Sequence, residues 1–316
     1  CTQLCRSLSK HCRSFRVFNF TCLISYCGFS GFDLSADEMA GHYSENEISE
    51  AVRRGTLTGK GGAWDLISKR VQAIPEYSDF FIDTYDHIES AQDIKFTDIS
   101  NAVAAFMEFE WRSDTSPFDD FLQGRLDLAI SQEKGMELFY GKANCSSCHA
   151  GALFTDHQFH ATGQPQVGPG KAARFQSHSR DLGRFRVTGN IKDKYAFRTP
   201  SLRNVELTGP WGHAGAYSNL EAFVYAHLNP YLALSNYDKS NVTLTKYDAN
   251  DWKIMDNANE VKAIADSITI KPVIISDGEV TDLLAFLGTL TDIKAQKGRL
   301  GIPETVPSGL EIPNPQ

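Results

Sequence analysis

The feature that most constrains this chain is the segment Cys145-Ser146-Ser147-Cys148-His149, in which two cysteines stand three residues apart and a histidine follows directly. This is the spacing of c-type haem attachment. Two thiols at this separation can add to the two vinyl groups of one porphyrin, and the adjacent histidine then lies under the iron. The motif therefore predicts covalent haem binding together with one axial iron ligand.

Three other interpretations of the motif are a redox-active dithiol, half of a zinc site and coincidence. A zinc site needs a second pair of ligands, and no cysteine follows Cys148. At this abundance of cysteine and histidine, a chance match has odds of roughly one in several hundred. Haem attachment is therefore the favoured interpretation.

Two predicted helices carry the apolar side chains that a haem needs. One precedes the motif, with Ser131 as its expected N-cap, and the other begins at a capping box formed by Ser276 and Glu279. The residues expected to face each other are Gly135, Leu138 and Phe139 on the first helix and Leu283, Leu284 and Leu287 on the last. In cytochrome c architecture, two crossed helices pack beside a haem that a long loop wraps, and here that loop is Ala150 to about Gly215. Ordinary core helices are the alternative interpretation of the same residues.

A second axial ligand must come from later in the chain. On the helix predicted after Ser218, the apolar positions recur at i, i+3, i+4 and i+7: Leu220, Phe223, Val224 and His227. A histidine on a buried face needs a partner. Without a haem, a core histidine bonded within the protein is the commoner outcome, but a haem iron in the same domain supplies that partner.

Other residues near this helix are weaker candidates for the second ligand. Tyr225 points off the apolar stripe, whereas His213 and Tyr217 precede the helix, and Met255 has polar neighbours. Two imidazoles stabilise ferric iron and lower the reduction potential, whereas a thioether ligand raises it. A haem with His149 and His227 as ligands also has no open position, so it is suited to relaying electrons.

The chain is predicted to be mainly helical, with no convincing strand pair. In the first half we expect one helix after Ser44 and three more at Ala63–Ala73, Asp79–Tyr85 and Thr97–Phe109. Ser113–Phe121 is predicted to be a linker. We expect an irregular N-terminal segment at 1–32, an incomplete cytochrome c domain at 33–125, a complete one at 126–292 and an extended tail at 293–316.

Composition excludes some classes of function. Lys and Arg number 31 against 39 Asp and Glu, a net charge of -8, so the chain lacks the basic excess that binds nucleic acid. No run of about 18 uncharged apolar residues is present, so we expect no transmembrane segment. Five cysteines crowd the first 27 residues in irregular surroundings, which suggests a disulfide-bearing extension, a lipid-modified Cys1 or, the favoured interpretation, sequence foreign to the folded protein.

Three segments resemble the bacterial di-haem cytochrome c peroxidases, and within them the MauG-like branch: Gly135 to Gly151, Tyr195 to Phe223, and Asp37 to Gly41. The resemblance implies a periplasmic oxidoreductase with two cytochrome c domains, one haem c in each and a calcium ion between them. It further implies that the C-terminal haem passes electrons from a small redox protein to the N-terminal haem, where hydrogen peroxide is reduced. In MauG-like members, side chains of a partner protein are oxidised instead.

The resemblance also implies roles for particular residues. Cys145, Cys148 and His149 match the C-terminal haem motif, and His227 matches the distal ligand, which is Met in typical peroxidases and Tyr in MauG. Thr208 and Pro210 match two positions whose backbone carbonyls bind the calcium ion. Glu38 matches a carboxylate that shuttles a proton beside the peroxidatic iron. A solvated residue before a helix is the alternative interpretation of Glu38.

The sequence departs from the family upstream of Glu38. The expected N-terminal Cys-x-x-Cys-His motif is missing, because Cys1 and Cys5 are four residues apart and Cys12 follows a histidine. The tryptophan expected between the haems is also missing, since none precedes Trp64. As written, one haem c is attachable. The chain is then either a fragment with an incomplete first domain, which we favour, or a variant that has lost one haem. The alternative functions are a single-haem electron carrier and, more weakly, a haem-free thiol-redox or metal-binding module.

Overall fold

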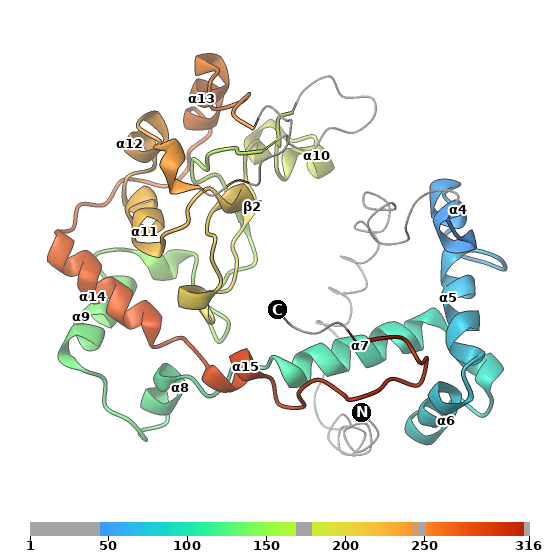
Figure 1. The fold of residues 1–316 in the computed structure, drawn as a ribbon. Helices are drawn as coiled ribbons and strands as arrows, with labels where there is room; N and C mark the ends of the chain where they lie inside the picture. The colour runs from blue at the N-terminus through green and yellow to red at the C-terminus, as the bar shows by residue number, and fades with distance from the viewer. Residues whose placement is uncertain (1–44, 169–178, 243, 245–250, 313–316) are drawn as a thin grey trace. The chain divides into compact units, whose positions relative to one another are not determined.

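The computed structural model describes residues 45–168, 179–242, 244 and 251–312 (Figure 1). The chain divides into two compact units, Cys1–Arg112 with Lys297–Gln316, and Ser113–Gln296. Both units are mainly helical, as predicted. Among the described residues, no helix is long and apolar enough to cross a membrane. Residues Ser113 to Arg125, which we expected in the first domain, cluster with the second unit.

The described part of the first unit consists of short helices. In chain order they are α4 (Glu47–Arg53), α5 (Ala63–Gln72), α6 (Pro75–Thr84), the 3-10 turn η2 (Ala91–Asp93) and α7 (Phe96–Glu110). The core between α4 and α5 consists of buried Ile48, Ala51, Val52 and Ala63. The helices predicted at Ala63–Ala73 and Thr97–Phe109 correspond to α5 and α7, and their bounds are confirmed to within about one residue.

The first residue of α4 was predicted wrongly. Its N-cap is Asn46 and not Ser44, because the Asn46 carboxamide oxygen accepts hydrogen bonds from the backbone N–H groups of Ile48 and Ser49 at 3.0 and 2.9 Å. Asparagine and serine are equally good N-caps, so composition alone does not choose between two candidates two residues apart.

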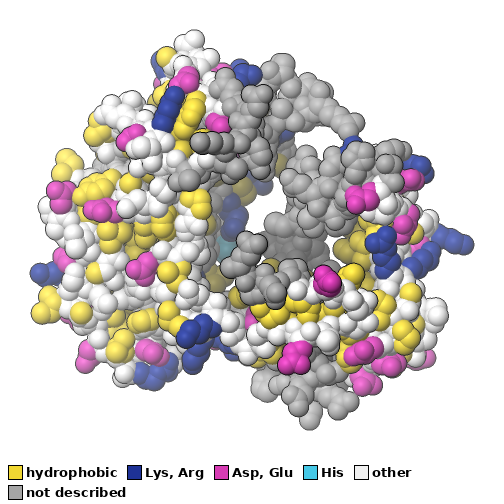
Figure 2. Space-filling view, viewed as in Figure 1, with side chains coloured by type: hydrophobic (Ala, Val, Ile, Leu, Met, Phe, Trp, Pro, Cys, Tyr) yellow, Lys and Arg dark blue, Asp and Glu magenta, His cyan; other side chains and the backbone are white. Residues whose placement is uncertain are grey.

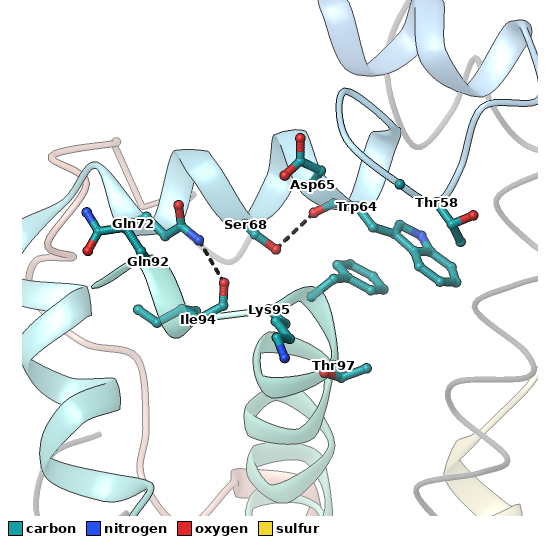
Figure 3. A pocket seen from close by; sticks show the side chains of 11 residues that line it. Thr58, Trp64, Asp65, Ser68, Gln72, Gln92, Ile94, Lys95 and Thr97 are labelled. Atoms are coloured by element: carbon teal, nitrogen blue, oxygen red, sulfur yellow. Dashed lines mark hydrogen bonds between the residues drawn. The ribbon is translucent and has the colours of Figure 1, made fainter. Parts of the chain in front are cut away.

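A pocket of about 330 Å³ lies between α5 and the start of α7 (Figure 3). The indole of Trp64 stacks on the ring of Phe96 at 4.9 Å between centroids, and the side chain of Gln72 donates to the carbonyl of Ile94 at 2.8 Å. The residues that line this pocket include no cysteine and no histidine. It therefore offers no group for covalent haem attachment or iron ligation.

The second unit contains the predicted haem motif. Its helices are α8 (Pro117–Leu122), α9 (Ile130–Tyr140), α10 (Phe185–Thr188), α11 (Leu220–Leu228), α12 (Pro230–Ser235), α13 (Ala258–Ala265) and α14 (Asp277–Gly288), followed by α15 (Ile293–Lys297). Its 3-10 turns are η3 (Cys145–Ser147), η4 (Ile191–Asp193), η5 (Val205–Leu207), η6 (His213–Gly215) and η7 (Lys239–Asn241). On the face shown in Figure 2, acidic and basic side chains are interspersed.

Helices α9 and α14 cross in close contact, as predicted. A Cβ atom on Gly135 would lie 1.9 Å from the carbonyl oxygen of Asp282, so only glycine permits this approach. Beside the crossing, the rings of Phe139 and Phe286 lie 5.1 Å apart, and both side chains are almost fully buried. Ser276 forms the predicted capping box of α14 with Glu279.

Several local predictions in this unit were wrong. Ser113–Phe121 is not a linker, because α8 begins at Pro117 and buries Phe118 in the core. Ala129 and Asn219 are the N-caps of α9 and α11, in place of the predicted serines. The side chain of Ser131 instead hydrogen-bonds Asp282 on α14.

The long loop between α9 and α11 contains one short strand pair that the sequence did not predict. Strands β1 (Phe159–His160) and β2 (Phe197–Arg198) are antiparallel, with Phe159 opposite Arg198 and His160 opposite Phe197. Two-residue strands are too short to show an alternating pattern, so this pair could not be predicted from the sequence. Apart from the short helix α10 and the 3-10 turns, the rest of the described loop is irregular, as expected.

Candidate haem-attachment site

The predicted haem motif lies at the turn after α9. Cys145 begins η3 and Cys148 follows it, and both side chains are free thiols with intermediate exposure. Burial raises the pKa of Cys145 to about 11, so this thiol is protonated at neutral pH. The adjacent apolar core of α9, α11 and α14 contacts Cys145 directly. Both sulfur atoms are therefore available, and an apolar surface adjoins them.

The imidazole of His149 is held by a hydrogen bond to the backbone. Its Nδ1 donates to the carbonyl oxygen of Phe154 at 3.0 Å. Because a carbonyl can only accept, the proton of the neutral ring is on Nδ1 and the lone pair is on Nε2. Burial lowers the pKa of His149 to about 4, so the ring is neutral at physiological pH. A neutral imidazole with a free Nε2 is what a haem iron requires of an axial ligand.

His227, on α11, is held in the same way. Its Nδ1 donates to the carbonyl oxygen of Phe223 at 3.1 Å, and the Phe223 ring lies edge-on at 4.5 Å between centroids. Burial lowers the pKa of His227, which keeps this ring neutral as well. After burial itself, the proximity of His227 is one of the influences that lower the pKa of His149. The fold thus brings the two predicted ligands within electrostatic reach of each other.

The weaker candidates for the second ligand have other partners. The hydroxyl of Tyr225 donates to the carboxylate of Asp277 at 2.7 Å. The ring of His213 stacks on Phe197 at 3.8 Å, and its Nε2 lies 3.3 Å from a carboxylate oxygen of Asp181. These contacts occupy the polar atoms with which Tyr225 and His213 would bind iron.

The remaining two candidates lie in other parts of the second unit. Tyr217 is buried in a cluster with Val167, Ala216 and Ala226, and burial raises the pKa of its phenol. Met255 lines a pocket of about 510 Å³ bordered by α12 and α13.

An arginine that the sequence did not single out supports the motif from behind. The guanidinium of Arg203 binds both carboxylate oxygens of Asp119, at 2.6 and 2.9 Å, and donates to the carbonyl of Ala152 at 2.8 Å. It also lies 5.4 Å from the centre of the Phe154 ring. Arg203 therefore ties α8 to the loop whose Phe154 carbonyl orients His149. Since Asp119 and Arg203 are 84 residues apart, spacing gave no indication of this pair.

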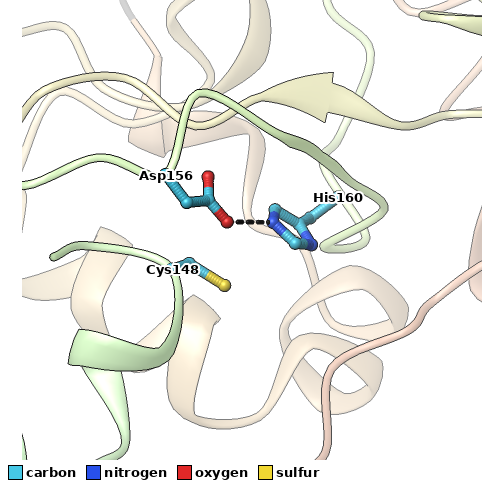
Figure 4. Close-up of side chains that lie close together, drawn as sticks. All are labelled: Cys148, Asp156 and His160. Carbon is cyan, nitrogen blue, oxygen red and sulfur yellow. Dashed lines mark hydrogen bonds and ion pairs between the residues drawn. The ribbon is translucent and has the colours of Figure 1, made fainter.

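A second polar group adjoins the motif (Figure 4). A carboxylate oxygen of Asp156 lies 2.7 Å from Nε2 of His160. Ligand atoms of Cys148, Asp156 and His160 all lie within 4.8 Å of one another. Within the described part of the chain, this is the one such cluster of cysteine, histidine and carboxylate groups.

The remaining predicted site residues are Thr208, Pro210 and Glu38. Thr208 and Pro210, to which the resemblance assigned calcium, are exposed residues in the loop after η5. Glu38, to which it assigned proton transfer, lies outside the described residues, as do the first five cysteines.

A mainly helical fold with a Cys-x-x-Cys-His segment is typical of c-type cytochromes. Residues 34–127 match the sequence profile of the family described as di-haem cytochrome c peroxidase. The resemblance to this family is thereby confirmed, and the family implies haem c as the cofactor.

Curated relatives and a solved structure agree with this family. The chain is 30% identical over 204 residues to cytochrome-c peroxidase IdrP1 of Pseudomonas sp. (strain SCT), covering 57% of this chain and 52% of that protein. It is also 30% identical over 243 residues to methylamine utilization protein MauG of Methylorubrum extorquens, covering 76% of this chain and 55% of that protein. A crystal structure of a MauG-like protein associated with microbial copper homeostasis aligns with a TM-score of 0.50 and 26% identity, covering 78% and 69% of the two chains. The chain spans about half the length of the curated relatives it matches.

Proposed function

We propose that this chain is a haem c oxidoreductase of the peroxidase type, which reduces hydrogen peroxide with electrons from a small redox protein. The observation that carries the proposal is the pair of neutral histidines, His149 and His227, each with Nδ1 bonded to a carbonyl, beside two free thiols. Reduction of one hydrogen peroxide to two water molecules takes two electrons and two protons. In this proposal, the haem of the second unit only relays electrons, and peroxide is reduced at a separate position.

The chain's own residues have distinct tasks in this proposal. Bound haem supplies the one-electron exchange between ferric and ferrous iron. Cys145 and Cys148 would hold it covalently, and His149 and His227 would each offer an unprotonated Nε2 to its iron. The carbonyls of Phe154 and Phe223 keep the proton of each ring on Nδ1. With both histidines bound to the iron, the second unit would relay electrons and would not itself bind peroxide.

The remaining parts of the proposal follow from the resemblance. Peroxide reduction is assigned to the N-terminal domain with Glu38 as its proton shuttle, calcium to the carbonyls of Thr208 and Pro210, and the periplasm as the location. A protein substrate oxidised in the manner of MauG is the variant of this activity that the MauG-like relatives suggest. The net charge of -8 suits a basic electron donor.

A second candidate function is a single-haem electron carrier. The observation that favours it is the same pair of histidines, because two imidazole ligands leave the iron without an open position. The two candidates differ in the number of haems and in turnover. A carrier has one haem and no peroxide reduction, whereas the proposed enzyme reduces peroxide.

The test is to produce the chain in a host competent for cytochrome maturation and to measure covalent haem by mass spectrometry and peroxide-dependent oxidation of a reduced small cytochrome. The matched control is the double variant Cys145→Ala, Cys148→Ala, which we expect to carry no covalent haem. Haem with turnover supports the proposed enzyme, and one haem without turnover supports the carrier. A colourless wild-type product overturns both and supports the haem-free thiol-redox or metal-binding module.

A further inference from the structure

Asp156 and His160 form a polar pair directly against the haem motif (Figure 4). The backbone N–H of Asp156 donates to the carbonyl oxygen of Cys148 at 2.8 Å, so the two residues are joined through the main chain. The Asp156 carboxylate lies 2.7 Å from His160 Nε2, and both groups are within 4.8 Å of the Cys148 sulfur. Their side chains are only 23% and 30% exposed. The pair therefore lies beside one of the two cysteines that would hold the haem.

The pair is fixed in position from both sides. The carboxylate of Asp156 also accepts a hydrogen bond from the backbone N–H of Gln158 at 2.8 Å. His160 belongs to β1, where it is paired with Phe197 of β2. A charge held by these contacts acts on its neighbours from a constant distance, unlike a charge on a mobile surface side chain.

Haem attachment removes one member of the three-residue cluster as a metal ligand. Zinc binds cysteine as a charged thiolate. A sulfur bonded to a porphyrin carbon is an uncharged thioether, so only Asp156 and His160 remain as strong ligands, and two ligands do not make a stable site. In the haem-bound protein, the pair is then left as a carboxylate and an imidazole beside the cofactor.

We propose that Asp156 and His160 set the reduction potential of the haem held by Cys145 and Cys148, the Asp156 carboxylate lowering it and the His160 imidazole offsetting part of that effect. This inference rests on the proposed haem attachment. A fixed negative charge near the iron favours the ferric state, because reduction removes one positive charge from the centre that the carboxylate stabilises.

The electrostatics of Asp156 support a fixed negative charge at this position. Burial raises the pKa of Asp156, but the hydrogen bonds, with that of His160 the largest, outweigh it and lower the pKa to about 2, so Asp156 is an anion at neutral pH. Both members of the pair lie within 4.8 Å of the Cys148 sulfur, and Cys148 directly precedes the residue that we propose as an iron ligand.

The test is spectroelectrochemical titration of the haem-loaded full chain and its variants. Asp156→Asn keeps the shape of the side chain and removes its charge. We expect the ratio of ferrous to ferric haem at a fixed potential to rise about tenfold, equivalent to about 59 mV for a one-electron couple. Asp156→Glu keeps the charge and should restore most of the wild-type potential. His160→Ala should move the potential the other way, because the carboxylate loses its hydrogen-bond donor.

The matched control is Asp266→Asn, which removes the same charge from an exposed ion pair with Lys262 in the same unit. We expect no measurable shift for it. If the variants carry covalent haem and Asp156→Asn leaves the potential unchanged, or if Asp156→Asn and His160→Ala shift it in the same direction, the inference is overturned while haem attachment stands. If Asp156→Asn fails to load haem, the His160→Ala variant tests the inference. A lowered reduction potential supports it, and an unchanged or raised one overturns it. Wild-type chain without covalent haem overturns the proposed function and this inference together.

Discussion

His149 and His227 are anchored by the same kind of hydrogen bond, from Nδ1 to a backbone carbonyl, although one lies in a loop and the other on a helix. The acceptor for His149 is Phe154, five residues on, and the acceptor for His227 is Phe223, one helical turn before it. Both rings therefore present an unprotonated Nε2. Convergence of two separate segments on one tautomer is expected where the two rings share a single metal centre.

Replacing His227 with alanine should open a coordination site on the haem. We expect His227→Ala to convert low-spin ferric haem to high-spin, because one strong-field imidazole ligand is lost. Electronic absorption and electron paramagnetic resonance spectra of the oxidised protein measure the change. The substituted side chain is at the end of α11, so we expect the helix to be retained.

The control for this experiment is His213→Ala. Its ring already contacts Phe197 and Asp181, so its removal should leave the spin state unchanged. A high-spin spectrum from His213→Ala and a low-spin one from His227→Ala would exchange the roles of the two residues.

The crossing of α9 and α14 should be intolerant of any side chain at position 135. A methyl group on Gly135 meets the carbonyl oxygen of Asp282 at 1.9 Å, and backbone cannot move aside as a flexible side chain can. We expect Gly135→Ala to lower the free energy of unfolding by about 1–3 kcal/mol, the cost of overpacking a close contact. Chemical denaturation followed by circular dichroism measures it.

Gly278→Ala, in the first turn of α14, is the matched control. A Cβ at this position meets only the Ser276 hydroxyl oxygen, at 4.0 Å, so alanine should stabilise the helix by up to about 1 kcal/mol. Equal effects of the two substitutions would show that the helix crossing is looser than the structure indicates.

The features that the sequence predicted well are those encoded by residues close together in the chain. The capping box at Ser276 and Glu279 has its full signal within four residues, and the structure has it. Gly135 was expected at the helix crossing because it shares one helix face with the apolar residues Leu138 and Phe139. Where two good caps compete, as Ser44 and Asn46 do, local chemistry is equal and does not predict which of them caps the helix.

The features that the sequence did not reveal depend on loop geometry. Asp156 and His160 are four residues apart, but no helix joins them; His157 between them has a φ of 56°, in the left-handed region, and the chain turns there. A histidine in that conformation has no sequence signature. Arg203 and Asp119 meet only after the long loop has folded back on α8, so their pairing depends on the whole unit.

The fork of hydrogen bonds made by Arg203 should not be replaceable by lysine. A lysine retains the charge but cannot bind both oxygens of Asp119 and the carbonyl of Ala152 at once. We expect Arg203→Lys to lower the free energy of unfolding by about 1–2 kcal/mol, measured by urea denaturation. Arg198→Lys, at an exposed position with contacts of 3.4 Å, is the control and should change it little. A similar loss in both variants would contradict a special role for the Arg203 fork.

The partner of this arginine should make stability depend on pH. Burial raises the pKa of Asp119, but the hydrogen bonds from Arg203 and Ser116 outweigh burial, so the pKa lies below its ordinary value. A carboxylate that is more acidic in the folded chain than in the unfolded one stabilises the fold above the ordinary pKa. This contribution is lost as the pH falls through the folded value.

We therefore expect Asp119→Asn to lower the free energy of unfolding by about 1.5–3 kcal/mol at neutral pH, and this deficit to shrink below about pH 4. Urea denaturation of the wild type and the variant at a series of pH values measures the difference. Asp266→Asn, which removes an exposed carboxylate, should show a small deficit throughout. An Asp119→Asn deficit that stays constant into strongly acidic solution would mean that the asparagine acts by altered packing, since lost packing does not depend on a proton.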